Sequence, residues 1–559
     1  EDIDIRGNAD VKINLHIDKK NSKTHLKSTY EVHGGKLFFH DQKTWLQNIN
    51  IKGFVESVDS LSFKKFILTA KEASASINKK SKINGSFIIS DLNKLTLNAQ
   101  LNYNLNLAEV NKNLKNSPFN FIKGDLQGST IYKRSLSNKF SVTQLIKNGK
   151  HHIKNKKKDI VCRYKGFKKD FIIESIDADY KNDKFDIKES KLLVGDTDID
   201  FKGEVKNFIK FIFDDNINFN LNGDARSTYI NFNELFDIKS DNKPIKKDEE
   251  ELFLPKWINA RINYKVGNFI YEDLLCKEAA GKINYSKGLL NINDIEMESL
   301  NGVLKGSVKL VEFPAKHLHL SANADFKNLN IRNGFSSFRN FNQTFIKDEH
   351  LKGLANGAIK LNAYWDSNFK FNYKKFDLHS HIIIEKGELI QFKPLEKMSA
   401  YINIEDLKDV KFSTLENTIN IKNEIITIPI MEIKSTALSL FVSGTHTFDK
   451  KIDYSIRLLL SELLSSKFRK RNTNITNKLI GSKNKNELWN TIYLKMTGDT
   501  DDPKISFDKI KIGENIKNNI KKEKEIIKNI IKEDLLNQKK KSDDIKKEEN
   551  NLIIEWDDE

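Results

Sequence analysis

The sequence predicts a mainly β protein: a long, curved antiparallel sheet that forms a groove from repeated hairpins, with a few short helices and a charged C-terminal helix. Three observations lead to this fold class. Apolar and polar residues alternate along most of the chain, which is the period of a strand with one apolar and one hydrated face. A two-strand unit recurs around a glycine. The 559 residues include only 7 prolines, which suits long uninterrupted strands.

The clearest copy of this unit lies in residues 425–460. Leu440 and Val442 share one parity before Gly444, and Tyr454 belongs to a second alternating run after a short polar break. Two alternating runs around a short polar break are typical of an antiparallel hairpin.

Three further copies align with the first on their glycines. They span 83–107 (Gly85), 197–225 (Gly203) and 299–326 (Gly306). The four glycines lie 118, 103 and 138 residues apart, which indicates a diverged array with loop insertions and not a strict solenoid. A glycine inside a strand often marks a bulge or bend, and bends curve a sheet. An ordinary β-sandwich of four similar hairpins is the alternative interpretation.

Charge and periodicity divide the chain into four expected segments. Residues 237–251 are charged and have no apolar periodicity, as is typical of a linker. The expected segments are 1–236 as the N-terminal part of the groove, 237–256 as a charged linker or loop, 257–508 as a C-terminal β region and 509–559 as a charged helical tail.

Helical patterns occur at three places outside the strands. Phe335, Phe338, Phe341 and Phe345 have the spacing of one helix face, and we expect this helix to pack on the sheet, with insertion into a membrane surface as the alternative. Residues 461–490 are basic and in part helical in pattern, and 514–549 carry a narrow isoleucine stripe among Lys and Glu.

The net charge of +17 comes from 94 Lys and Arg against 77 Asp and Glu. Such an excess is compatible with nucleic acid or an anionic membrane surface as a partner. The lysines are scattered over the polar parity of the strands, however, and zinc-finger spacing, aromatic RNA-binding motifs and a basic recognition helix are absent. We therefore expect no nucleic acid. Residues Lys467–Arg471 are the first candidate for contact with anionic headgroups, and a solvated linker is the alternative.

The sequence contains no recognisable catalytic chemistry. Nucleotide-binding, zinc-protease, nucleophile-elbow and CxxC motifs are absent. The adjacent His151 and His152 have no carboxylate or cysteine at ligand spacing, and the DTDDP run at 499–503 is better explained as a turn than as a calcium loop. Cys162 and Cys276 lie far apart in the sequence, which leaves a single disulfide open as an alternative but gives no disulfide framework. We expect no enzyme activity, cofactor or metal.

The chain begins at Glu1 and contains no run of about 18 apolar residues. It also lacks a signal-peptide core. We expect a mature or shortened product, with any membrane anchor placed before Glu1.

An antiparallel sheet without helical crossovers has to bury its apolar face on something. A second sheet, closure into a barrel and an apolar ligand in a concave groove are the possibilities. Acyl chains would gain about 0.8 kcal/mol for each buried methylene in such a groove. The groove-lining candidates are Leu95, Leu97, Leu101, Ile199, Phe201, Phe219, Leu221, Leu304, Val308, Leu318, Leu320, Leu438, Leu440, Val442, Ile452, Tyr454 and Ile456.

Residues 387–458 resemble the C-terminal region of AsmA-like proteins. The shared pattern is a Gly-led strand, the turn PLEKMS, the strand IPIMEIKS and then VSG before FD. YLKMTGDTDDPKISFD (493–508) is similar to the closing strands of that family, and IIEWDDE with residues 341–361 resembles the variant in Bacteroidetes-type bacteria. The resemblance covers about 258–508 and is weaker over 1–236, where HGGKLFFHD and the hairpin rhythm match.

The resemblance implies a location and a task. AsmA-like proteins are anchored in the inner membrane of Gram-negative bacteria, project into the periplasm and take part in outer-membrane biogenesis. Their relatives include TamB-type and bridge-type lipid transfer proteins, in which a long apolar β-groove is thought to carry phospholipids. The expected partners are therefore phospholipids, the inner membrane and outer-membrane assembly proteins.

Three functions remain in competition at this point. The first is transport of phospholipid acyl chains, which requires a continuous apolar inner face. The second is a scaffold for outer-membrane protein assembly, which needs only a free edge strand. The third is a carbohydrate-binding β-sandwich, which requires aromatic residues on the hydrated parity, whereas Phe201, Phe219, Phe326 and Tyr454 share the apolar parity.

Overall fold

The computed structural model describes most of the chain between residues 3 and 507. The parts outside the described residues are 1–2, 19–22, 40–43, 58–64, 78, 92–94, 112–118, 136–148, 156–159, 165–168, 214–216, 236–254, 314–316, 343–345, 367–370, 393–407, 436–438, 460–490 and 508–559. The predicted linker at 237–251, the basic stretch at 461–490, the C-terminal tail and Leu438 therefore lie outside the described residues.

The described chain has the predicted mainly β fold. Its 27 strands belong to one open, mostly antiparallel sheet. The α-helices of the described part are short: α1 (Leu107–Val110), α3 (Phe208–Phe213), α4 (Phe232–Leu235) and α5 (Ile331–Ser337). The alternative of a β-sandwich is wrong, because consecutive strands pair within one sheet and do not form two facing layers. No helix of the described residues is long and apolar enough to cross a bilayer.

The chain divides into two units, which are described separately. Unit 1 comprises residues 1–329 and 358–376, and unit 2 comprises 330–357 and 377–559. This division differs from the expected boundary at 237–256.

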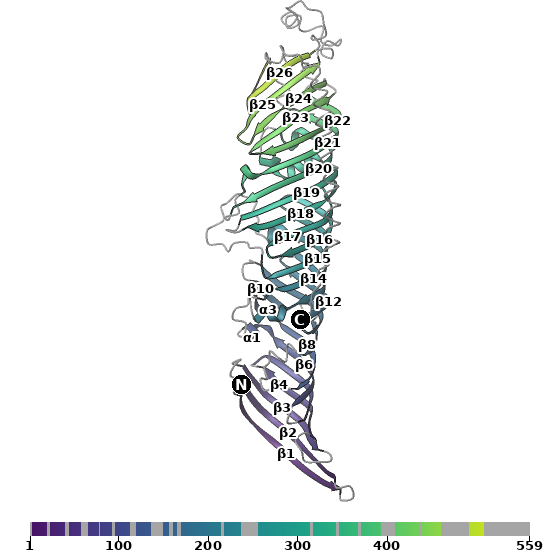
Figure 1. Cartoon of the computed structure of the whole chain (residues 1–559), viewed down its shortest axis with the longest axis vertical. Helices are drawn as coiled ribbons and strands as arrows, with labels where there is room; N and C mark the ends of the chain where they lie inside the picture. Colours follow the sequence, from purple (N-terminus) through teal and green to yellow (C-terminus); the bar gives the residue numbers. More distant parts are fainter. Residues whose placement is uncertain are drawn as a thin grey trace, which may run out of the picture. The chain divides into compact units, whose positions relative to one another are not determined.

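Unit 1 contains the longest series of strands (Figure 1). They are β1 (Ile3–Asp18), β2 (Lys23–Phe39), β3 (Thr44–Ser57), β4 (Phe66–Ile77), β5 (Ser81–Ser90), β6 (Thr96–Asn106), β7 (Phe119–Lys123), β8 (Asp125–Ser135), β9 (Lys150–Asn155), β10 (Ile160–Tyr164), β11 (Asp170–Lys181), β12 (Lys184–Val194), β13 (Thr197–Lys206), β14 (Phe219–Asn231), β15 (Ile258–Tyr271), β16 (Leu274–Ser286), β17 (Leu289–Ser299), β18 (Gly302–Phe313) and β19 (His317–Asn330). These strands pair in chain order, except that β6 pairs with β8, β7 with β10 and β9 with β11. Strand β20 (Leu351–Trp365) is shared between the units.

Unit 2 continues with antiparallel pairs. Its strands are β21 (Asp377–Ile390), β22 (Asp409–Lys422), β23 (Ile425–Lys434), β24 (Ser439–Thr447), β25 (Lys451–Leu459), β26 (Thr491–Asp499) and β27 (Pro503–Phe507). Short 3-10 turns precede them: η4 (Arg339–Asn342), η5 (Asp348–His350) and η6 (Tyr373–Lys375), the last of which lies in unit 1.

The four predicted hairpins are confirmed as antiparallel pairs. They are β5 with β6, β13 with β14, β18 with β19, and β24 with β25. In three of them the connection is short, whereas β13 and β14 are separated by α3 and a further segment. The recurring unit is therefore a strand pair whose loop varies, as expected for a diverged array.

The shared glycines lie where the backbone of the neighbouring strand leaves no room for a Cβ atom. A Cβ atom on Gly203 would lie 2.2 Å from the carbonyl oxygen of Asn222 and 2.6 Å from Cα of Gly223, and φ of Gly203 is +153°. A Cβ on Gly444 would similarly lie 2.2 Å from the carbonyl oxygen of Asp453. Only glycine leaves room for this backbone contact.

Strands β14 and β15 pair in parallel across the predicted linker. Their register runs from Phe219 opposite Ile258 to Asn231 opposite Ile270. The sheet is therefore continuous from one side of residues 237–256 to the other, within unit 1.

The single helix predicted from the phenylalanine spacing is wrong in part. Helix α5 ends at Ser337, Phe338 caps it, and η4 follows at Arg339. Arg339 and Asn340 both have positive φ, which an α-helix does not tolerate. Gly334 and the asparagines favour such a break over a long helix, and Phe345 lies outside the described residues.

We expect Gly203→Val to weaken the β13–β14 pair by about 2 kcal/mol, because the new side chain meets the backbone of the adjacent strand and the residue must leave φ of +153°. Hydrogen–deuterium exchange of β13 and β14 measures the effect. Asn284→Val, at an exposed strand position, is the matched control and should change protection little. Equal protection in Gly203→Val and the native protein would contradict the close-contact explanation.

Candidate functional site: an apolar sheet face

An uninterrupted series of cross-strand neighbours places apolar side chains on one face of unit 1. Residues directly opposite each other in a sheet share a face, so the registers can be followed from strand to strand. The resulting apolar row is Ala9, Val32, Ile51, Ala73, Gly85, Leu101, Thr130, His151, Tyr180, Phe185, Val205, Leu221, Ala260, Tyr285, Leu290, Leu310 and Leu320. Gly85, Thr130 and His151 are its only members without an aliphatic or aromatic side chain.

The adjacent residues form a polar row on the opposite face. It consists of Ser74, Asn84, Asn102, Ser129, His152, Asp179, Asp186, Glu204, Asn222, Arg261, Asn284, Asn291, Lys309 and Ser321. Every member carries a polar or charged side chain. The two rows of unit 1 therefore differ in character over these strands, although exposed Ile88 and Ile131 share the parity of the polar row.

Ion pairs join neighbouring strands on the polar face. Nδ1 of His152 lies 2.8 Å from Oδ1 of Asp179, and Nζ of Lys184 donates to Oε1 of Glu204 over 2.6 Å. Hydrogen bonds from Lys188 and then from His152 lower the pKa of Asp179. These pairs are largely exposed, so each contributes little to stability, but they keep this face charged and hydrated.

The apolar face, by contrast, is only partly covered. In the apolar row Tyr180, Val205 and Ala260 are buried, Ala9 is exposed, and the other members are half-buried. The side chains of a closed core would be buried along the whole row. Apart from Tyr180, Val205 and Ala260, the row therefore presents an apolar surface that an apolar ligand can contact.

Tyrosines on this face are shielded from water. Tyr103, which has the parity of Leu101 on β6, is mostly buried, and this burial raises its pKa to about 12. Burial also raises the pKa of Tyr180 and of Tyr285 in the apolar row. Loss of hydration disfavours the phenolate, so the neutral form of each tyrosine persists on this face.

Most groove candidates of unit 1 lie on the apolar face. They share strand parity with members of the apolar row, and they are Leu97, Leu101, Ile199, Phe201, Phe219, Leu221, Leu304, Val308, Leu318 and Leu320. Leu95 does not join them, because β6 begins at Thr96 and Leu95 is an exposed residue with φ of +44°.

The candidates of unit 2 form a corresponding face on β24–β26. Val442, Ile456 and Leu494 are cross-strand neighbours, as are Gly444, Tyr454 and Met496. Leu494 and Met496 belong to this face but are not among the groove candidates predicted from the sequence. The alternation of apolar and polar residues in 491–499 could have indicated them.

This face is more deeply buried than that of unit 1. The described candidates Leu440, Ile452, Tyr454 and Ile456 are each at most 7% exposed. Burial raises the pKa of Tyr454 to about 12 and lowers that of His446. The apolar face is therefore open in unit 1 and covered at these positions of unit 2.

A hollow of about 800 Å³ lies among strands β2–β8 of unit 1. Its lining includes Asn84, Asn102 and Ser129 of the polar row, together with the ion pair between Glu31 and Lys52 at 3.0 Å. Members of the apolar row, among them Val32, Ile51 and Leu101, also line it, so the hollow is of mixed polarity.

Among the described residues, no group of three or more His, Cys, Asp or Glu side chains is placed to hold a metal ion. His151 lies in the apolar row beside Tyr180, with ring centroids 5.6 Å apart, whereas His152 binds Asp179 on the opposite face. Adjacent strand residues point to opposite faces, so these two histidines cannot ligate one ion together. Cys162 and Cys276 are both buried free thiols.

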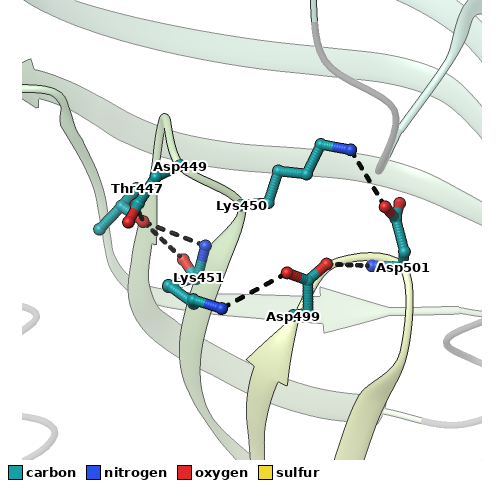
Figure 2. Close-up of polar contacts among 6 residues, drawn as sticks. All are labelled: Thr447, Asp449, Lys450, Lys451, Asp499 and Asp501. Atoms are coloured by element: carbon teal, nitrogen blue, oxygen red, sulfur yellow. Dashed lines mark hydrogen bonds and ion pairs between the residues drawn. The ribbon is translucent and has the colours of Figure 1, made fainter.

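The acidic run at 499–503 forms a turn between β26 and β27, as predicted. Figure 2 shows its carboxylates next to lysines of the preceding hairpin: Nζ of Lys450 lies 3.0 Å from Oδ2 of Asp501, and Nζ of Lys451 lies 3.5 Å from Oδ2 of Asp499. The amide of Asp501 also donates to Asp499 Oδ1 over 3.0 Å. The ammonium groups of the lysines pair with these carboxylates. The ion pairs therefore connect the turn between β24 and β25 with the turn between β26 and β27.

We expect the free energy of unfolding to fall between pH 10 and 12, and Tyr103→Phe to remove part of that fall. The phenol ionises near pH 10 in the unfolded chain but near pH 12 in the folded one, so rising pH favours the unfolded state by on the order of 2 kcal/mol. Urea unfolding at several pH values measures the change. Tyr373→Phe, at a half-exposed position, is the control, and the same slope in both variants would contradict the burial of Tyr103.

Comparison of the chain with protein-family models, with curated proteins and with solved structures finds no match.

Proposed function

We propose that the chain binds phospholipid acyl chains along the apolar face of unit 1 and carries them between membranes. The observation that carries this proposal is the apolar row, which crosses 17 strands from β1 to β19 without a charged side chain other than the titratable His151. An acyl chain is a ligand without hydrogen-bonding groups, and a half-buried apolar row offers it contact without requiring any.

The energetics favour such a ligand. Burial of ten methylenes contributes about 8 kcal/mol, and this gain requires no specific polar contact. The polar row on the opposite face remains in water, so binding does not cost it hydration. A headgroup can also stay hydrated, provided that it projects beyond the ends of the strands.

The cellular setting of the proposal rests on the sequence resemblance to AsmA-like proteins. Residues 387–458 carry that resemblance, and they include strands β22–β25. We infer a periplasmic protein that is anchored to the inner membrane and acts in outer-membrane biogenesis. The open antiparallel sheet supports this assignment, since the family is expected to have a long β-groove.

A scaffold for outer-membrane protein assembly is the second candidate. Strand β1 supports it, because the described registers pair β1 with β2 alone. Ile5, Val11 and Ile13 on this strand are 60–76% exposed. A long edge strand of this kind can accept a further strand from another protein.

We expect several phospholipids for each chain when the protein is purified from bacterial membranes and examined by native mass spectrometry. Folded protein without bound lipid would contradict acyl-chain transport and favour the scaffold. A single tightly held lipid would contradict an open groove and indicate a closed pocket.

Two adjacent residues of β6 provide a matched test of the face. Leu101→Asp places a charge in the apolar row, and we expect it to reduce the number of bound lipids, because the carboxylate would lose hydration. Asn102→Asp introduces the same charge in the polar row and should leave lipid binding unchanged. Equal lipid content in both variants would show that the apolar row is not the binding surface.

A further inference from the structure

Six aromatic residues of unit 1 form one cluster, here called the aromatic bridge. They are Phe119, Tyr164, Phe208, Phe211, Phe219 and Trp257. Phe211 stacks on Trp257 with ring centroids 4.9 Å apart, and it lies 5.1 Å from Phe219. Phe211 is 1% exposed and lies on Val205 of the apolar row. The bridge therefore covers the apolar face at this point.

The members of the bridge come from opposite rims of the sheet, where a rim is the line formed by the strand ends along one side. Helix α3 follows the end of β13, and Phe219 and Trp257 lie at the starts of β14 and β15. The registers place this rim beside Tyr180, near the end of β11. Phe119 and Tyr164 lie opposite each other at the other rim. The residue before Tyr164 is Arg163, which pairs with Asp170 at the start of β11.

These rims are far apart along the strands. Asp170 and Tyr180 are ten residues apart on β11, which corresponds to about 33 Å in an extended strand. Phe208 nevertheless contacts both rims: its ring centroid is 6.2 Å from that of Phe185 and 6.0 Å from that of Phe119. The sheet must therefore curl until its two rims meet, and Figure 1 shows β10 beside α3.

Direct contacts across the rims are numerous and tightly packed. Phe119 lies 6.2 Å from Phe211 and 6.3 Å from Trp257, and Tyr164 lies 5.4 Å from Trp257. Large aromatic side chains fill the space between the rims, and aromatic pairs stabilise such contacts beyond their buried area. This part of the groove is bridged by side chains, although no strand pair of the described residues closes it.

We propose that the aromatic bridge is a barrier that divides the apolar face of unit 1 into two acyl-binding sections. One section includes Leu101 on β6, and the other includes Leu310 on β18. A chain cannot pass from one to the other while Phe208 and Phe211 fill the groove. This inference rests on the proposed function, and it identifies the residues that control movement along the face.

The test combines photo-cross-linking with lipid transfer by the full chain. Benzoylphenylalanine at Leu101 or at Leu310 reports lipid in each section, with vesicles of phosphatidylethanolamine and phosphatidylglycerol as the source. Transfer of a fluorescent phosphatidylethanolamine from donor to acceptor vesicles reports movement. We expect cross-links at both positions of the native chain.

Removal of either half of the bridge should open the barrier. Phe119→Ala and Phe208→Ala change opposite rims at half-buried positions, which the fold tolerates better than a change at the buried Phe211. We expect each to accelerate transfer about tenfold, which corresponds to about 1.4 kcal/mol lost from the barrier. Phe313→Ala, at the exposed end of β18, is the control and should not change the rate.

The possible results separate the two proposals. An absence of cross-links at Leu101 and at Leu310 in the native chain would overturn acyl-chain binding itself. Cross-links at both positions with unchanged or slower transfer in the folded Phe119 and Phe208 variants would overturn the barrier alone. Faster transfer in both variants, with circular dichroism as in the native chain, would support the barrier.

Discussion

The register of the strand pairs decides which side chains share a face, and all other properties of unit 1 depend on it. A slip of one residue would exchange the apolar row for the polar row on the strand concerned. β-Bulges lie directly beside the apolar row, between Val32 and Gly35 and between Ala70 and Ala73. Each bulge changes the register on one strand, and the following residues regain the same face.

In unit 1, charged side chains and the open apolar surface lie on opposite faces of the sheet. Lysines are abundant, and on the polar face several of them pair with carboxylates of neighbouring strands, as Lys184 does with Glu204. The apolar row carries no lysine. On the described strands of unit 1 the lysines therefore follow the hydrated parity, and there they do not by themselves identify an anionic partner.

The sequence predicted the features that depend on local periodicity. The alternation of apolar and polar residues was enough to identify the hairpins and to place Phe201 and Leu304 on the apolar face, because a strand has only two faces. It failed at Leu95, where a positive φ precedes the strand. It also could not predict the aromatic bridge, since Phe119, Phe208 and Trp257 meet only when the sheet curls. The burial of Ile452 and Tyr454 likewise depends on packing that periodicity does not encode.

The parallel pairing of β14 with β15 has a consequence for the rims at which the hairpins turn. Duplication of an antiparallel hairpin adds two strands and returns the chain to the same rim. A parallel neighbour instead requires a connection that crosses from one rim to the other, here between Asn231 and Ile258. The parallel junction therefore reverses the rim at which the following hairpins turn, while the apolar row stays in register across it.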